Sequence, residues 1–141
     1  MNEFRWTRLI LAGLAAGAVL LAGETILNSF VLGIEWQQVL LRLRVAPLSG
    51  PVAALLVSDT FLLGVFQAWL IGRLRRTAGV AMPRVVLEAA FIVWLTVFLF
   101  TGTWLTLLGI VSPRLMLFSS LWGLGECVLS SLIAAWILTR R

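Results

Sequence analysis

The chain has 141 residues, of which 61% are hydrophobic and only 12% charged, and its mean hydropathy is +1.05. A soluble domain carries about 25% charged residues, so this chain cannot cover a water-facing surface around so large an apolar share. A soluble enzyme, a disordered segment and a disulfide-rich secreted domain are therefore excluded. A helix needs about 20 residues to cross a bilayer, so the composition predicts an all-α, polytopic membrane protein with four spans.

Several residue types that carry chemistry are absent. The chain has no histidine, tyrosine or lysine and only one cysteine, so all eleven positive side chains are arginine. The commonest metal ligand and general base is therefore missing, and no nucleophile–base pair is visible. We expect no metal, no cofactor and no enzymatic activity. The net charge of +5 does not predict nucleic-acid binding, because the arginines flank the apolar runs.

Four apolar segments, separated by arginines and prolines, predict spanning helices in a single membrane domain covering residues 1–141. They run over residues 9–33, 52–71, 85–107 and 115–138. The first is too long for a signal peptide, whose apolar region has about 7–15 residues. Pro51, Pro83 and Pro113 precede the other three, and proline is favoured at the first helical position. The short third connection makes its helices antiparallel neighbours, so an antiparallel four-helix bundle is expected.

The connection 34–50 is the longest segment outside the predicted spans. Trp36, Val39, Leu40 and Leu43 recur in it at helical spacing, with polar residues between them. This pattern predicts a short helix lying in the outer membrane interface. A partly ordered loop is the alternative.

The arginines predict the orientation of the chain. With the N-terminus inside, eight arginines fall on the cytoplasmic side and three outside: inside are Arg5, Arg8, Arg73, Arg75, Arg76, Arg84, Arg140 and Arg141, and outside are Arg42, Arg44 and Arg114. Cytoplasmic loops of membrane proteins carry the excess of arginine and lysine. Both ends of the chain are therefore expected in the cytoplasm.

Three of the six acidic residues, Glu24, Asp59 and Glu126, lie near the middle of a predicted span. An acid at that depth costs roughly 2.5–3.5 kcal/mol on insertion scales. These groups must be protonated and hydrogen-bonded, or gathered around a cation or a water-filled cavity. They form either interhelical packing contacts or a functional site for a proton, a cation or a polar ligand. Glu88 differs, because it follows Arg84 by one helical turn and is expected to pair with it.

Helical spacing places these acids on stripes of polar and small residues. The candidate polar site within the membrane comprises Glu24, Asn28, Asp59, Glu126 and Ser130. The candidate helix-packing residues are Gly13, Gly17, Ser119, Gly123, Cys127 and Ser131. Small residues let neighbouring helices approach closely, and each glutamate precedes an amide or hydroxyl by four residues. The stripes do not fix helix rotation, so whether the three acids converge stays open.

A resemblance supports this architecture. It lies in the stretch Arg8–Gly17, which leads to Glu24 and Asn28, and in the stretch Leu121–Glu126. In these stretches the chain resembles a group of small four-helix inner-membrane proteins from bacterial genomes. The resemblance implies a bacterial inner-membrane location and the four-helix architecture. It implies no activity.

Two functions follow as hypotheses. The first is an accessory or assembly subunit of a larger membrane complex, because the chain combines little soluble mass with small-residue stripes and apolar surfaces. The second is a small homo-oligomeric transporter or channel, coupled to protons or cations through the central carboxyl groups. The expected partners are the lipid bilayer and other membrane subunits or further copies of the chain, with no nucleic acid.

Overall fold

The computed structural model describes residues 3–45, 49–78 and 81–140, and every regular element in these ranges is helical. Four continuous helical stretches are long and apolar enough to cross a membrane: Trp6–Val31, Gly50–Arg76, Met82–Leu107 and Pro113–Thr139. The expected all-α class is therefore confirmed, and the four stretches indicate a multi-pass membrane protein.

Two of these stretches contain a π-helical segment, and two are uninterrupted α-helices. The first stretch is α1 (Glu3–Ile26) with η1 (Leu27–Val31), and the third is α4 (Met82–Val93) with η2 (Trp94–Phe100) and α5 (Thr101–Leu107). The uninterrupted helices are α3 (Gly50–Ala78) and α6 (Pro113–Thr139), and the short helix α2 (Gly33–Leu43) follows η1. The helices extend beyond most of the expected boundaries, and a break at Leu32 falls inside the segment predicted over 9–33.

The turn between α5 and α6 is fixed by two residues with special backbone roles. Gly109 has a φ of 70°, in the left-handed region that glycine adopts without steric cost. Ser112 then caps α6, since its hydroxyl accepts a hydrogen bond from the Leu115 N–H at 3.2 Å. Pro113, at the start of the helix, needs no hydrogen-bond acceptor there. The chain thus reverses within a few residues, and α6 packs back along α4, η2 and α5.

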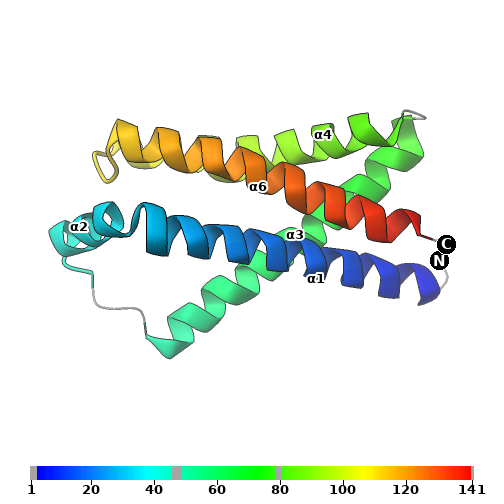
Figure 1. The fold of residues 1–141 in the computed structure, drawn as a ribbon, viewed down its shortest axis with the longest axis horizontal. Helices are drawn as coiled ribbons and strands as arrows, with labels where there is room; N and C mark the ends of the chain where they lie inside the picture. Colours follow the sequence, from blue (N-terminus) through cyan, green and yellow to red (C-terminus); the bar gives the residue numbers. More distant parts are fainter. Residues whose placement is uncertain (1–2, 46–48, 79–80, 141) are drawn as a thin grey trace.

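Helices α1 and α6 lie side by side and run in opposite directions, while α3 crosses them obliquely (Figure 1). The N- and C-termini lie together at one end of the molecule. There, Arg8 Nη1 donates a hydrogen bond of 2.7 Å to the carbonyl oxygen of Arg140, which joins the start of α1 to the end of α6.

The crossing of α1 and α3 depends on three glycines. A Cβ atom at Gly64 of α3 would overlap the backbone of Gly13 and Gly17 in α1. Likewise, a Cβ atom at Gly17 would lie 2.7 Å from Phe61 Cδ1. The two backbones therefore touch at this point, which is how small residues support helix association in membranes.

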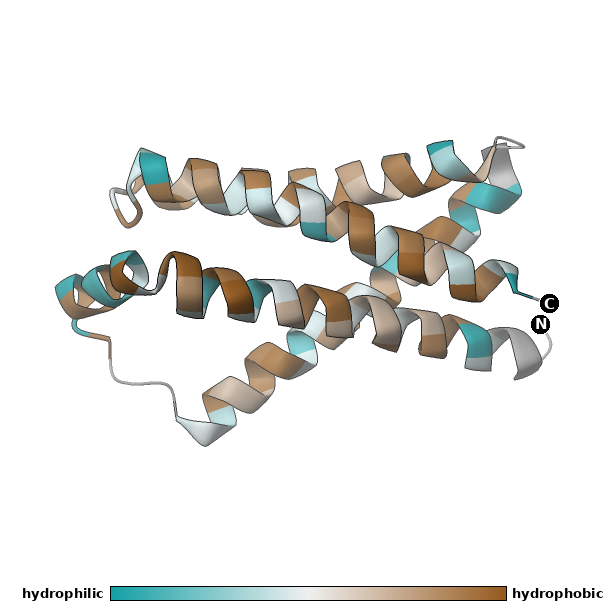
Figure 2. Ribbon diagram, viewed as in Figure 1, coloured by the Kyte–Doolittle hydropathy of each residue, from teal (hydrophilic) through white to brown (hydrophobic). Residues whose placement is uncertain are grey.

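The interior is built from small and polar side chains, whereas large apolar side chains lie on the outside. At the end that holds both termini, the core consists largely of alanine and valine, including Ala12, Ala16 and Ala68. Leucine, phenylalanine and tryptophan residues are widely exposed. Figure 2 shows apolar residues along the whole length of the long helices, with most hydrophilic residues near their ends. This distribution suits a protein whose outer surface contacts lipid.

The region 34–50, expected to hold an interfacial helix or a loop, contains most of α2, and its residues 46–48 lie outside the described residues. None of the residues of α2 is buried. Arg42 donates hydrogen bonds to the carbonyl oxygens of Gly109, at 2.9 Å, and Ile110. This arginine therefore attaches α2 to the α5–α6 turn.

Candidate functional site

A cavity of about 140 Å³, lined by both apolar and polar side chains, lies near α2, between the end of α1, η2, α5 and the beginning of α6. Its polar lining includes Glu24, Asn28, Trp36, Thr101, Ser119 and Ser120. The indole nitrogen of Trp36 and the hydroxyl of Ser119 are buried without a hydrogen-bond partner. Buried polar groups of proteins are almost always paired, so two unpaired atoms on residues that line one cavity distinguish this region from the rest of the interior.

Glu24 presents its carboxyl group to this cavity from the last turns of α1. Asn28 Nδ2 donates to Glu24 Oε2 at 2.6 Å, and both residues line the cavity. The pair spans the junction between α1 and η1, which begins at Leu27. Short π-helical segments inside α-helices occur frequently at functional sites, and η2 supplies Val97 and Phe98 to the same cavity.

Glu126 approaches the same region from α6. Its Oε1 accepts a hydrogen bond from the indole nitrogen of Trp122, while its Oε2 is buried without a partner. The carboxyl group lies against the backbone of Gly23, where any Cβ atom would overlap it. Gly23 directly precedes Glu24 in α1, so the Glu126 carboxyl group lies beside the backbone that carries Glu24. The structure therefore brings these two acids together across the α1–α6 contact.

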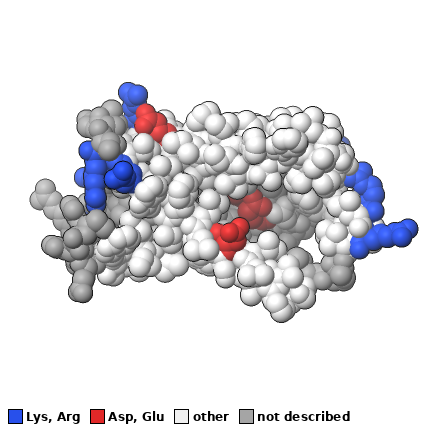
Figure 3. All heavy atoms as spheres, turned by 180° about the vertical axis from the view of Figure 1, so that it is seen from behind, with Lys and Arg blue, Asp and Glu red and all other residues white. Residues whose placement is uncertain are grey.

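Asp59 lies apart from the other two acids. It is exposed on α3, in a shallow apolar hollow formed by residues of the same helix, such as Leu55 and Leu62. Among the described residues its carboxyl group has no hydrogen-bond or ion-pair partner. The three central acids of the sequence thus form one pair and one separate group. Figure 3 shows acidic atoms in the middle of an otherwise uncharged face, with arginines toward both ends.

Ser130 belongs to a second polar cluster, between α3 and α6. Its hydroxyl donates to Gln67 Oε1 at 2.9 Å, and Gln67 Nε2 donates to Ser131 Oγ at 2.6 Å and to the Cys127 carbonyl oxygen at 2.9 Å. All four residues are fully buried. Gln67 is not among the site residues predicted from the sequence, although it is the only glutamine within a predicted apolar span. That feature was the signal that could have identified it.

The remaining helix-packing candidates lie at helix contacts. Gly13 and Gly17 face α3, and Gly123 faces Phe98 of η2 so closely that a Cβ atom would overlap its ring. Cys127 is fully buried beside Val93. The ion pair expected between Arg84 and Glu88 is confirmed, with a distance of 2.7 Å from Nε to Oε1.

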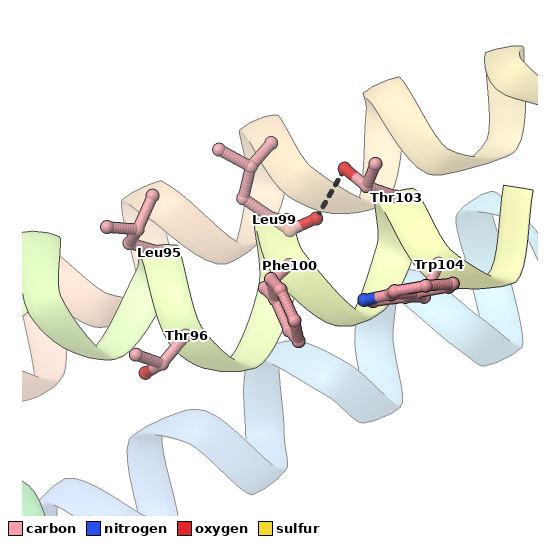
Figure 4. Close-up of a pocket in the computed structure, with 6 residues that line it drawn as sticks. All are labelled: Leu95, Thr96, Leu99, Phe100, Thr103 and Trp104. Atoms are coloured by element: carbon pink, nitrogen blue, oxygen red, sulfur yellow. Dashed lines mark hydrogen bonds between the residues drawn. The ribbon is translucent and has the colours of Figure 1, made fainter. Parts of the chain in front are cut away.

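A groove of about 570 Å³ runs along η2 and α5 and offers little chemistry. Figure 4 shows its six lining residues on one continuous helical stretch. The two hydroxyls, of Thr96 and Thr103, both donate to backbone carbonyls one turn earlier, at 2.8 and 2.7 Å. Apart from these two hydroxyls, the Trp104 indole is the only lining side chain with a polar atom, so this groove suits an apolar lipid chain better than a polar ligand.

The cavity beside Glu24 is therefore the candidate site. Among the described residues, no group of three or more acidic or cysteine side chains is arranged to hold a metal ion. The resemblance inferred from the sequence remains a prediction. A comparison with protein-family models, curated proteins and solved structures finds no match for this chain.

Proposed function

We propose that the chain is a bacterial inner-membrane protein that acts as a homo-oligomeric proton- or cation-coupled transporter or channel. In this proposal the four long helices form an antiparallel bundle with α3 inclined, and both termini are cytoplasmic. The observation that carries the proposal is the cavity that Glu24 lines together with Trp36 and Ser119, two residues that each have a buried polar atom without a partner. A spanning protein with such a cavity offers a polar position within an otherwise apolar layer.

The two polar clusters of the molecule differ in a way that supports this function. In the cluster around Gln67, the amide and both serine hydroxyls have partners, as expected of a contact that only holds helices together. Around Glu24 and Glu126, by contrast, the Trp36 nitrogen, the Ser119 hydroxyl and one oxygen of Glu126 are left unpaired. Each unpaired buried group costs about 1–3 kcal/mol. Waters, either around a proton-carrying carboxyl group or in the hydration shell of a bound cation, would recover that cost, since a water oxygen can accept from the Trp36 N–H and a water hydrogen can reach the Glu126 oxygen.

The dimensions of the cavity restrict the ligand. A volume of about 140 Å³ holds a few waters or a small ion with part of its hydration shell. Only two carboxyl groups are close to it, and no metal-holding group of three exists among the described residues. These features favour a proton or a monovalent cation over a tightly held divalent metal. Because four helices enclose little space, a complete pathway requires two or more copies.

The test is flux in liposomes. Purified protein is reconstituted with a pH-sensitive dye inside, and a potassium gradient with valinomycin drives proton movement. We expect flux with the wild-type chain and the level of empty liposomes with Glu24→Gln or Glu126→Gln, since an amide keeps the shape of the side chain but cannot carry a proton. A parallel assay with sodium or potassium gradients distinguishes cations from protons.

Glu88→Gln is the matched control, because it also neutralises an acid of a long helix, but one that is paired with Arg84 outside the cavity. It should retain wild-type flux. Helical content and elution volume in detergent establish that all three variants are folded. Wild-type flux in both Glu24→Gln and Glu126→Gln would overturn the proposal.

A second candidate function, an accessory subunit of a larger membrane complex, is favoured by a different observation. The first half of α3 exposes Asp59 together with large apolar side chains such as Leu55, which is 70% exposed, and Leu62, which is 66% exposed. A bare carboxyl group on a lipid-facing surface is costly, and a partner helix with a hydrogen-bond donor would remove that cost.

A further inference from the structure

A second cavity, of about 480 Å³, opens at the end of the molecule where the two termini lie. Four helices contribute to its lining: Arg8 and Leu9 from α1, Ile71, Gly72, Arg75 and Arg76 from α3, Met82 from α4 and Leu138 from α6. Its volume lies within the range of roughly 300–1,000 Å³ that is typical of small-molecule sites. The proposed transport function makes no use of this cavity.

The positive charge of this cavity favours an anionic ligand. Three of its lining residues, Arg8, Arg75 and Arg76, are arginines, and none of its described lining residues is acidic. The guanidinium group of Arg8 is held in place by its hydrogen bond to the Arg140 carbonyl oxygen. Arg75 and Arg76 extend from the exposed last turns of α3. Guanidinium groups bind phosphate oxygens with paired, charge-assisted hydrogen bonds.

The rest of the cavity favours a ligand that has an apolar part in addition to its anionic group. Leu9, Ile71, Met82 and Leu138 form an apolar wall, and Ile71 is fully buried. The cavity lies where four apolar helices meet their arginine-rich ends, which is the level of lipid headgroups in a membrane. A soluble phosphate would use the arginines and leave this wall uncovered, whereas a phospholipid would use both.

We infer that this cavity binds the phosphate-bearing headgroup of an anionic phospholipid. The arginines hold the phosphate, and the apolar wall contacts the glycerol and the first part of the acyl chains. Basic pockets between spanning helices are a known mode of headgroup recognition. The inference is independent of the Glu24 cavity, and it requires only that the four helices cross a membrane.

The test measures lipid binding to the full-length protein in detergent micelles by native mass spectrometry. We expect the wild-type chain to retain phosphatidylglycerol in preference to phosphatidylcholine. The variant Arg75→Gln/Arg76→Gln should lose about tenfold or more in affinity for phosphatidylglycerol. The control Arg44→Gln/Arg114→Gln removes the same charge from the opposite end of the molecule and should bind like the wild type.

A second variant tests the space of the cavity without changing its charge. A Cβ atom at Gly72 meets no atom within 4 Å, so Gly72→Leu should fold and place its side chain in the cavity. We expect it to weaken phosphatidylglycerol binding. Gly125→Leu is the matched control, because a Cβ atom at Gly125 also has open space and this residue lies outside the cavity. It should bind like the wild type.

Competition with inorganic phosphate separates the two sources of the anion. Retention of phosphatidylglycerol in an excess of phosphate supports a lipid site, while complete displacement at millimolar phosphate would assign the cavity to a soluble anion and overturn the inference. Equal retention of phosphatidylglycerol and phosphatidylcholine would also overturn it. So would unchanged affinity in both Arg75→Gln/Arg76→Gln and Gly72→Leu.

Discussion

At the scale of single residues, Gln67 is the side chain that joins α3 to α6. Its amide group donates to Ser131 Oγ and the Cys127 carbonyl oxygen and accepts from Ser130. Removal of the amide would leave the Ser131 hydroxyl without this partner in a fully buried position, and Ser130 and the Cys127 carbonyl oxygen would keep only their bond of 3.2 Å to each other. Leaving a buried polar group unpaired costs more free energy than one hydrogen bond contributes. The contact between α3 and α6 therefore depends strongly on Gln67.

The substitution Gln67→Met tests this dependence, because methionine has a similar length and no hydrogen-bonding amide. We expect it to lower the free energy of unfolding by about 1–3 kcal/mol, measured by chemical denaturation in detergent micelles. Gln37→Met, on the exposed side of α2, should change it little. Equal stability of Gln67→Met and the wild-type chain would contradict the role given to this cluster.

The same cluster explains why the candidate site could be predicted only in part. Glu24 and Asn28 are four residues apart and were grouped on that basis, and the structure bonds them to each other. The same spacing grouped Glu126 with Ser130, yet Glu126 accepts from Trp122, one turn earlier, and Ser130 donates to Gln67 on another helix. Spacing along one helix identifies possible partners, but the neighbouring helix decides which of them is used.

At the scale of helices, the crossing of α1 and α3 sets the position of everything else. The backbone contact between Gly64 and Gly13 brings α3 against α1 at a steep inclination (Figure 1). Local composition was enough to predict the helical class and the number of long helices, and the prolines indicated where three of these helices start. The inclination of α3 could not be predicted, because it arises from packing between helices distant in sequence, and no local signal in the sequence marks the π-helical segments η1 and η2.

The substitution Gly64→Ala tests the crossing. Its methyl group would overlap the backbone of α1, which has no rotamer to relieve the overlap, so we expect a loss of about 1–3 kcal/mol in the free energy of unfolding. Gly125→Ala adds the same methyl group where no atom lies within 4 Å. It should be neutral or stabilise α6 by up to about 1 kcal/mol. A Gly64→Ala protein as stable as Gly125→Ala would show that α1 and α3 do not touch here.

At the scale of the whole molecule, the first half of α3 stands out from a body that is otherwise closely packed. It leans away from α1 and α6 (Figure 1), and its exposed surface combines Asp59 with leucine side chains. Lipid chains would provide an apolar environment for the leucine side chains, but they offer no hydrogen-bond donor to the Asp59 carboxyl group. This surface is therefore where another membrane chain would bind if the protein serves as an accessory subunit.

Purification from native cells in a mild detergent tests that role. We expect a subunit to co-purify with a partner chain at fixed stoichiometry, and Asp59→Asn to release the partner. Ser58→Ala is the control, because the Ser58 hydroxyl donates only to the Ala54 carbonyl oxygen of its own helix. Recovery of a lone monomer or homodimer from native cells would contradict the subunit role and leave homo-oligomeric transport.

The hydrogen bond between Arg8 and the Arg140 carbonyl oxygen fixes the start of α1 against the end of α6. The first and last of the long helices therefore have their outer connection points at the same end of the molecule (Figure 1). A linker from the end of α6 in one copy to the start of α1 in another would stay at that end and would not have to run along the helices. Two copies joined in this way would keep their long helices in the same orientation.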